Sequence, residues 1–227
     1  PDMVVTMQKA AAIVTNEGGV TAHAAIVSRE MGIPAVVGTE NATSVLEDGM
    51  EVTVDGFNGK VFTGIAKSKK VEILPIVEGT KIKIKVLLDL PEFAERASKT
   101  KADGVGLVRL EGIIASEGKH PMYYEKKDKL DDYTKMLRSG LSKISEMFIG
   151  KEIWIRTSDI RSDEYSNLEG APKEIEKNPM LGNHGIRFSL KNQEIFKAEL
   201  RAVKLLAEKG HKFGLMFPQV ISSDEVK

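Results

Sequence analysis

The sequence predicts an α/β protein in which a small α/β domain precedes a larger unit of repeated strand–helix pairs. Over residues 1–65, short apolar runs alternate with turn signals of glycine, proline and asparagine. From residue 82 onward, strand patterns and helix patterns follow one another at longer spacing. Residues 66–81 are rich in lysine and lack sustained periodicity, which is typical of a solvated linker. We therefore expect a domain over 1–65, a linker over 66–81 and a second domain over 82–227.

The first domain has the pattern of a compact strand–helix–strand unit followed by a hairpin. An apolar run at 11–15 predicts a buried strand, and the pattern at 22–31 predicts a helix that stops at Gly32. Thr21 is placed to cap this helix. A second strand is expected at 35–37, and alternation at 51–55 and 60–63 around a glycine-rich turn predicts the hairpin.

The second domain has the pattern of a parallel sheet covered by helices. The expected strands are 82–88, 104–108, 152–156 and 213–217, and the expected helices are 92–98, 123–147 and 193–208. Charged or polar residues follow the strands, at Asp89, Arg109, Glu111, Arg156, Asp159 and Gln219. Function gathers at the carboxyl ends of strands in such folds. Four strands are half the number of a closed (β/α)₈ barrel, so we expect its first half, with an exposed strand edge that favours pairing or aggregation.

Composition excludes several classes of protein. The 33 basic and 33 acidic residues give a formal net charge of zero, so neither nucleic acid nor a membrane surface is indicated as a partner. No apolar stretch is long enough for a membrane helix, and the chain has no cysteine. We expect a cytoplasmic protein. Because the chain opens on Pro1 without an initiator methionine, we also expect a piece of a longer one.

His23 lies in the segment with the densest candidate chemistry. Gly18 and Gly19 precede it and allow the backbone to turn sharply and approach a bulky group. In the first turn of the predicted helix, the dipole favours anions and disfavours imidazolium, so the ring keeps a lone pair for nucleophilic attack. The alternative is an ordinary capping or packing histidine. No second ligand at metal spacing accompanies His23, so we expect no metal there.

The longer motif around this histidine resembles a known family. Residues 18–38 have the pattern Gly-Gly-x-Thr-x-His-x-Ala-Ile-x-x-Arg-Glu-x-Gly-Ile-Pro-x-x-Val-Gly, in which x is any residue. This pattern is similar to the mobile phosphohistidine domain of phosphoenolpyruvate-utilising enzymes. The resemblance implies that His23 carries a phosphoryl group between two active sites, with Thr21 as its hydroxyl neighbour and Gly18 and Gly19 as the phosphate loop.

Three later segments resemble the catalytic barrel of the same family. Residues 104–111, 153–159 and 178–182 are similar to its second strand, its third strand and the following loop. The resemblance implies that Arg109 and Arg156 bind phosphoenolpyruvate or pyruvate, for which a planar guanidinium is suited. For either arginine alone, an ion pair with Asp159 or Glu111 is the more common role.

One position departs from the family pattern. The family commonly has arginine after Asn-Pro-x-Leu-Gly-x, where this sequence has His184, while Arg187 is retained three residues later. His184 supplies a weaker, pH-dependent phosphate contact, or Arg187 takes over, or phosphate affinity is reduced. The sequence leaves these three alternatives open.

The segment from Arg156 to Leu168 resembles the phosphoenolpyruvate synthase branch of the family. The resemblance implies a homo-oligomeric pyruvate, water dikinase that uses ATP and Mg²⁺. Its nucleotide-binding domain, magnesium ligands, proton-donating cysteine and second half-barrel are expected outside these residues, so residues 1–227 alone are expected to be inactive. The alternatives are pyruvate phosphate dikinase, a phosphocarrier of an enzyme I-like relay, and a structural α/β domain with coincidental motifs.

Overall fold

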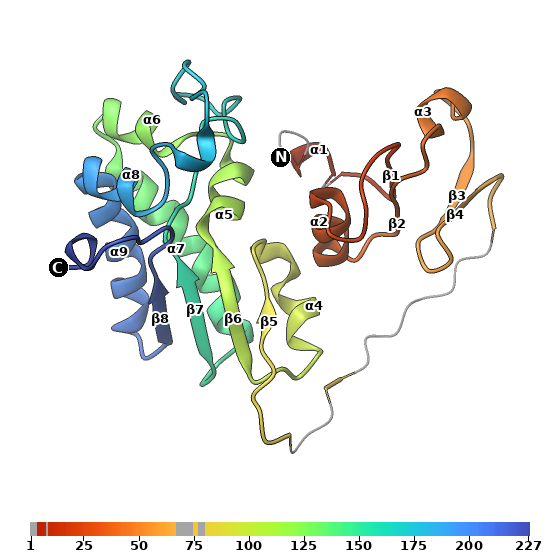
Figure 1. The fold of residues 1–227 in the computed structure, drawn as a ribbon. Coiled ribbons are helices and arrows are strands. Elements are labelled where there is room, and N and C mark those ends of the chain that lie inside the picture. The colour runs from red at the N-terminus through yellow and green to blue at the C-terminus, as the bar shows by residue number, and fades with distance from the viewer. Residues whose placement is uncertain (1–3, 8, 67–74, 77–79) are drawn as a thin grey trace. The chain divides into compact units, whose positions relative to one another are not determined.

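A computed structural model of the chain describes residues 4–7, 9–66, 75–76 and 80–227. The chain divides into two compact units, essentially residues 3–72 and 73–227 (Figure 1). Residues 67–74 and 77–79, which make up most of the predicted linker, lie outside the described residues. None of the helices in the described ranges is long and apolar enough to cross a membrane.

The first unit contains a parallel strand pair joined by a helix, and an antiparallel hairpin. Its elements are α1 (Val4–Met7), β1 (Ile13–Val14), α2 (His23–Met31), β2 (Ala35–Val36), α3 (Ala42–Val45), β3 (Val52–Asp55) and β4 (Lys60–Thr63). β1 pairs with β2 in parallel, and β3 pairs with β4 antiparallel. Gly32 ends α2 in the left-handed region at φ 68°, as predicted. The predicted helix and hairpin are confirmed, whereas both parallel strands are shorter than predicted.

The second unit is built on a four-stranded parallel sheet. Its strands are β5 (Val86–Leu87), β6 (Gly104–Arg109), β7 (Glu152–Arg156) and β8 (Lys212–Met216), hydrogen-bonded in that order. The helices and 3₁₀ turns between and after them are η1 (Pro91–Phe93), α4 (Ala94–Ser98), α5 (Leu110–Glu117), α6 (Pro121–Lys126), α7 (Leu130–Met147), η2 (Pro179–Leu181), α8 (Ile186–Lys191), α9 (Gln193–Ala207) and η3 (Ser223–Glu225). The predicted parallel sheet covered by helices is confirmed.

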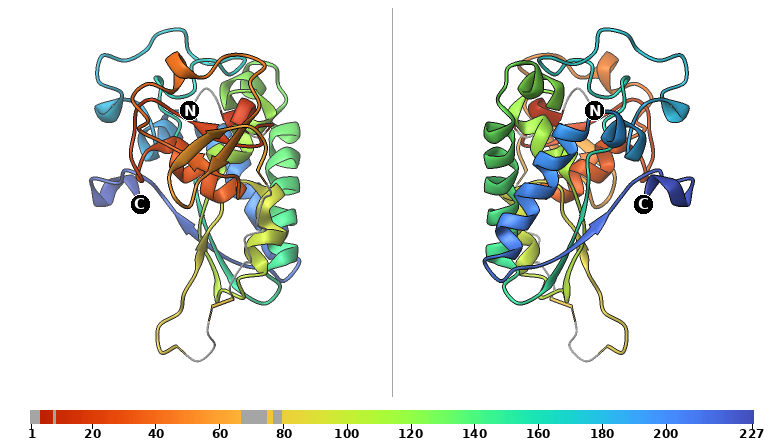
Figure 2. Two further views of the ribbon diagram at one scale, coloured as in Figure 1. Left: turned by 90° about the vertical axis from the view of Figure 1, so that its right-hand side faces the viewer. Right: turned by 90° about the vertical axis from the view of Figure 1, so that its left-hand side faces the viewer.

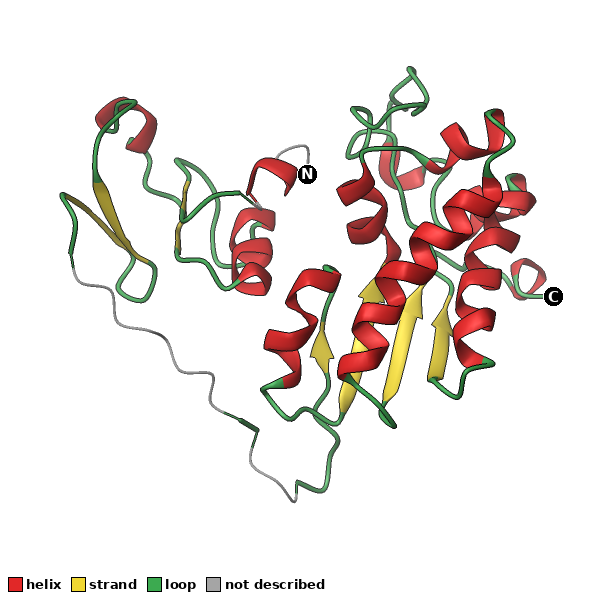
Figure 3. Cartoon of the chain, turned by 180° about the vertical axis from the view of Figure 1, so that it is seen from behind, coloured by secondary structure: helices red, strands yellow, loops and turns green. Residues whose placement is uncertain are grey.

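Helices cover one face of this sheet. Figure 3 shows α4, α7 and α9 in front of the strands, whereas the opposite view in Figure 1 shows the strands themselves, and Figure 2 shows the layers edge-on. The core between the layers is formed by buried side chains that include Val105, Val108, Leu137, Leu141, Ile144, Ile153, Ile155, Ala202 and Leu206. On the other face, Trp154 of β7 packs over Gly214 of β8, because a Cβ on Gly214 would lie 2.6 Å from the indole ring.

Two predicted elements of the second unit are wrong in extent. The expected strand 82–88 is reduced to β5, because Val86 pairs with Val105 near the start of β6 and earlier residues extend past the partner strand. The expected helix 123–147 is two helices, α6 and α7. Asp128 separates them at φ 56°, a left-handed conformation that aspartate tolerates better than most residues.

Candidate functional site

The loop before His23 is closed by two glycines that approach other parts of the backbone. Gly18 lies at φ 103°, and a Cβ there would meet the Cβ of Ala22 at 2.9 Å. Gly38, in the loop after β2, lies at φ 73°, and its Cβ would come within 2.6 Å of the Gly18 carbonyl oxygen. Gly19 has open space around its Cα. Gly18 is therefore required by the close packing of the loop, whereas the space beside Gly19 is open.

His23 is the first residue of α2, and its side chain is exposed. The first turn of a helix presents backbone N–H groups and a partial positive charge, which favour an anion beside the ring. The predicted cap is wrong: the N-cap is Ala22, and no side chain caps the helix. The capping residue is one position later than predicted, because Thr21 is still part of the turn before the helix. An exposed ring at this helix end is accessible to a reacting group.

Arg29, near the C-terminal end of α2, is hydrogen-bonded to the turn that precedes His23. Its guanidinium donates to the carbonyl oxygen of Val20, in the turn that precedes His23. The sequence analysis gave Arg29 no role beyond its place in the extended motif. Its recurrence in the extended motif was the available signal. The contact ties the last turn of α2 to the loop that carries His23 and Thr21.

At the carboxyl ends of the first two strands of the second unit, Arg109 pairs with Asp89. Arg109 Nη1 lies 2.9 Å from Asp89 Oδ2, and the Arg109 backbone N–H donates to Asp89 Oδ1 at 3.0 Å. Burial raises the pKa of the Asp89 carboxyl above its ordinary value, while Arg109 opposes that rise. The Asp89 carboxylate thus orients the Arg109 side chain. The ion pair uses one of the five guanidinium N–H groups, so the others remain as donors.

Arg156, at the end of β7, is held by two carboxylates. Its Nη2 donates to Glu111 Oε1 at 2.8 Å, and its Nη1 lies 3.7 Å from Asp159 Oδ2. The Asp159 backbone N–H also donates to Glu111 Oε1. Arg156 is the register neighbour of Arg109 on the adjacent strand, so both guanidinium groups belong to the same end of the sheet. The ion pairs expected as a structural alternative are therefore present for Arg156, whereas Arg109 pairs with Asp89 instead of Asp159 or Glu111. Both arginines are preorganised by these pairs.

Glu111 is almost fully buried, at 3% exposure. Burial raises the pKa of its carboxyl to about 7, although Arg156 and the hydrogen bonds oppose the rise. Its second oxygen, Oε2, and Arg156 Nε are buried without a hydrogen-bond partner. A buried polar atom without a partner is costly, so this pair contains one unsatisfied acceptor, Glu111 Oε2, and one unsatisfied donor, Arg156 Nε.

A buried carboxylate on α9 fixes the loop that follows β7. Glu199 Oε1 accepts hydrogen bonds from Ser158 Oγ at 2.5 Å and from the Tyr133 hydroxyl at 3.0 Å. Its Oε2 accepts from the Ser158 backbone N–H at 3.2 Å. Glu199 is 1% exposed, and burial raises the pKa of its carboxyl. Sequence reasoning missed this residue, because nothing in a helical pattern marks one glutamate as facing a distant strand end.

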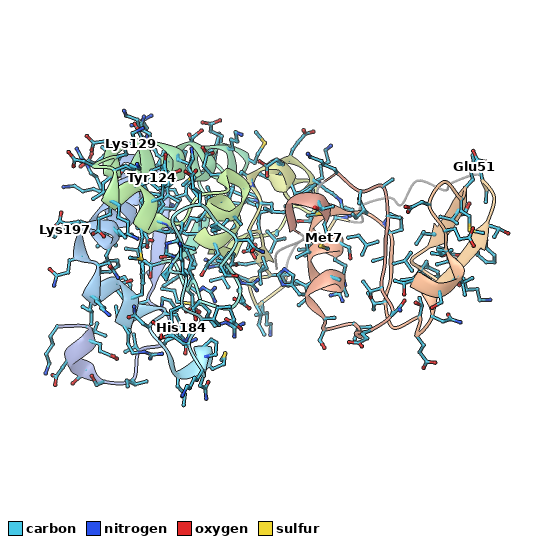
Figure 4. All side chains as sticks on the ribbon, turned by 90° about the horizontal axis from the view of Figure 1, so that it is seen from above. Met7, Glu51, Tyr124, Lys129, His184 and Lys197 are labelled. Atoms are coloured by element: carbon cyan, nitrogen blue, oxygen red, sulfur yellow. The ribbon has the colours of Figure 1, made fainter. Side chains whose placement is uncertain are left out.

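His184 lies in the segment between η2 and α8, and Arg187 lies in the first turn of α8. His184 is buried, with Nδ1 2.7 Å from Asp159 Oδ1 and Nε2 3.0 Å from the Met180 carbonyl oxygen. Arg187 is half-buried, and its Nε donates to the Gly182 carbonyl at 2.8 Å. In Figure 4, His184 lies on the opposite side of this unit from Tyr124 and Lys129. The structure therefore brings His184 to Asp159 and, through Asp159, to Arg156.

Two family profiles match this chain. The description "PEP-utilising enzyme, mobile domain" matches residues 1–59, and "PEP-utilising enzyme, PEP-binding domain" matches residues 64–227. The chain belongs to the PEP-utilising enzyme family. The predicted family membership is confirmed, and so is the order of a mobile phosphohistidine domain and a portion of a PEP-binding domain.

Curated relatives in the PEP-utilising enzyme family are similar over the whole chain. A probable phosphoenolpyruvate synthase of Archaeoglobus fulgidus is 48% identical, and the match covers 100% of this chain and 31% of that protein. The phosphoenolpyruvate synthases of Pyrococcus furiosus and Aeropyrum pernix are 45% and 39% identical, each over 100% of this chain and 30% of the relative. The chain thus spans about a third of the length of these relatives.

The described residues do not form a metal site of their own. No group of three or more histidine, cysteine, aspartate or glutamate side chains could hold a metal ion within the part of the chain that the structure describes. The carboxylates Asp89, Glu111 and Asp159 are instead occupied with arginine or histidine partners. We therefore assign no metal ion to the described residues.

Proposed function

We propose that this chain supplies the phosphohistidine domain and the first half of the (β/α)₈ catalytic barrel of a phosphoenolpyruvate synthase. In this proposal the whole protein converts ATP, pyruvate and water into AMP, phosphoenolpyruvate and phosphate. The observation that carries the proposal is the exposed His23 at the first turn of α2, inside the segment that matches the family's mobile domain. The names of the relatives support the synthase branch over the dikinase and relay alternatives.

His23 is proposed as the nucleophile of a first phosphoryl transfer and as the leaving group of a second. A lone pair on the ring attacks the β-phosphorus of ATP, and the bond from that phosphorus to the AMP oxygen breaks. Water then releases the outer group as inorganic phosphate, which leaves a phosphohistidine. The backbone N–H groups at the start of α2 stabilise the negative charge of the resulting phosphohistidine. Thr21 is the hydroxyl neighbour of the ring, Gly18 and Gly19 form the loop beside the phosphate, and Arg29 holds that loop through Val20.

Arg109 and Arg156 are proposed to bind pyruvate and phosphoenolpyruvate at the strand ends. Each arginine uses part of its guanidinium for Asp89 or Glu111 and retains donors for a carboxylate or phosphate oxygen. The enolate oxygen of pyruvate, formed when the methyl group loses a proton, attacks the phosphorus, and the phosphorus–nitrogen bond to His23 breaks. Neutralisation of the enolate by preorganised cations is the contribution of these residues.

The whole protein is proposed to use ATP as a substrate and Mg²⁺ as a cofactor, and to form a homo-oligomer. The nucleotide-binding domain, the second half of the barrel and the magnesium ligands belong in this proposal to other parts of that protein. The relatives' greater length supports this arrangement.

The test is an assay of the enzyme from the complete open reading frame. We expect formation of phosphoenolpyruvate from ATP and pyruvate, loss of that activity in His23→Ala, and no turnover by residues 1–227 alone. Arg96→Ala is the control and should retain activity, because Arg96 lies in the last turn of α4, remote from the strand ends. Wild-type activity in His23→Ala, or turnover by residues 1–227 alone, would contradict the proposal.

A further inference from the structure

His184 is held at the carboxyl ends of the strands by the backbone of the residues that follow it. The next residue, Gly185, lies at φ 59°, and a Cβ there would come within 2.8 Å of the Pro218 carbonyl oxygen after β8. Ile186 N–H donates to the same carbonyl at 2.9 Å. The ring is therefore fixed between the exits of β7 and β8 and is 1% exposed.

Both nitrogens of the His184 ring face hydrogen-bond acceptors. The Met180 carbonyl oxygen, 3.0 Å from Nε2, can only accept, so Nε2 carries a hydrogen. Asp159 Oδ1 lies 2.7 Å from Nδ1, and the other oxygen of this carboxylate faces Arg156 Nη1 at 3.7 Å. An ionised Asp159 also only accepts. The His184 ring can therefore donate to the Met180 carbonyl and to an ionised Asp159 at the same time if both of its nitrogens carry a hydrogen, that is, if it is an imidazolium.

This arrangement leaves no ring nitrogen for a substrate phosphate. A buried imidazolium between a carbonyl and a carboxylate has used both of its donors. Arg187, three residues later, has its Nε on the Gly182 carbonyl and is half-buried. Among the described residues, neither of its terminal nitrogens is hydrogen-bonded to a protein acceptor, so the guanidinium can bind an anion at the same loop.

We infer that His184 is a positioning residue, an imidazolium that holds Asp159 against Arg156, and that Arg187 is the residue of this loop that binds the substrate phosphate. The inference rests on the proposed function, since it assigns roles within the same site. It selects one of the three alternatives that the sequence left open.

The charged groups around the ring come from several elements. Asp159 and Arg156 face it from the exit of β7, and Glu111 on α5 is bonded to both of them. Glu176 accepts from the backbone N–H of Asn183, beside the histidine, at 2.9 Å. Asp159 bonds the ring itself, whereas Arg156, Glu111 and Glu176 are linked to it through Asp159 or through the neighbouring backbone.

The first test is nitrogen NMR of the chain at pH 7. Long-range nitrogen–proton spectra distinguish imidazolium from both neutral tautomers, and His184→Gln assigns the signals among the four histidines. We expect two protonated ring nitrogens in the wild type and one in Asp159→Asn, which removes the carboxylate. An unprotonated ring nitrogen in the wild type would overturn the inference.

The second test is the binding of phosphoenolpyruvate to the enzyme from the complete open reading frame and to its variants. Loss of a charge-assisted hydrogen bond predicts an affinity lower by about 10- to 100-fold in Arg187→Gln. A smaller loss is expected in His184→Gln. No loss is expected in Arg201→Gln, because Arg201 is an exposed residue of α9 that is paired with Asp131 of α7. A larger loss in His184→Gln than in Arg187→Gln would show that His184 is itself the ligand. Absence of binding by the wild type would instead refute the proposed function of these residues, while the NMR result still decides the state of His184.

Discussion

Substitution of Glu111 by glutamine should alter the pH dependence of stability of the second unit. In the folded chain, burial raises the pKa of this carboxyl from 4.5 to about 7. The folded state therefore holds the proton more tightly than the unfolded state between these pH values. Below pH 4.5 both states are protonated, and above pH 7 both are ionised. The contribution of Glu111 to the free energy of unfolding is thus present at low pH and is lost as the pH rises from about 4.5 to 7.

The size of this loss follows from the two pKa values. Each tenfold difference in proton affinity corresponds to about 1.4 kcal/mol, so the loss is about 3 kcal/mol. Glutamine keeps a carbonyl oxygen to accept from Arg156 and Asp159, and its amide replaces Oε2, which has no partner. Between pH 4.5 and 7, the free energy of unfolding should therefore fall by about 3 kcal/mol more in the wild type than in Glu111→Gln.

Urea unfolding at pH 4.5, 5.5, 6.5 and 7.5 measures this difference. Trp154 is the single tryptophan and lies on β7, so its fluorescence reports the second unit. Glu117→Gln, an exposed carboxyl on the same helix, is the control and should retain the wild-type pH dependence. Parallel curves for the wild type and Glu111→Gln would refute the assignment of a raised pKa to Glu111.

Two glycine substitutions test close approaches in the two units. Gly38→Ala should destabilise the first unit by about 2–3 kcal/mol, because it combines a left-handed φ with contact to the Gly18 carbonyl. Amide hydrogen exchange at residues 13–36 measures it. The control Gly59→Ala has the same sign of φ but open space, so about 1 kcal/mol is expected, and equal losses would contradict the close approach. Gly214→Ala should cost about 1–3 kcal/mol and shift the Trp154 emission; an unchanged spectrum and stability would show that the ring does not pack there.

The sequence predicted the layers of the fold well, because periodicity depends on local burial. The helix 193–208 and the strand 152–156 are found within a residue of their predicted ends. The break at Asp128 was missed, although the charged residues 125–129 interrupt the apolar pattern there. The extent of β5 could not be predicted, because it is set by where β6 begins rather than by the apolar run itself.

The sequence identified the charged residues at the strand ends, but not how they pair. Apolar strands followed by Arg109 and Arg156 indicated the end of the sheet where a site lies. The contacts of Glu199 with Ser158 and of His184 with Asp159 join residues 41 and 25 positions apart. Such pairs depend on how the helices and loops pack on the sheet, and a single sequence contains no local signal for that packing.

The central claim is that His23 carries the phosphoryl group, and mass spectrometry of its peptide tests this most directly. The enzyme from the complete open reading frame is incubated with ATP, or separately with phosphoenolpyruvate, and is digested under conditions that preserve phosphohistidine. The account predicts one phosphoryl group on His23 from either donor, and none in His23→Gln. A phosphoryl group found on another residue, or His23 labelled by phosphoenolpyruvate but never by ATP, would contradict it.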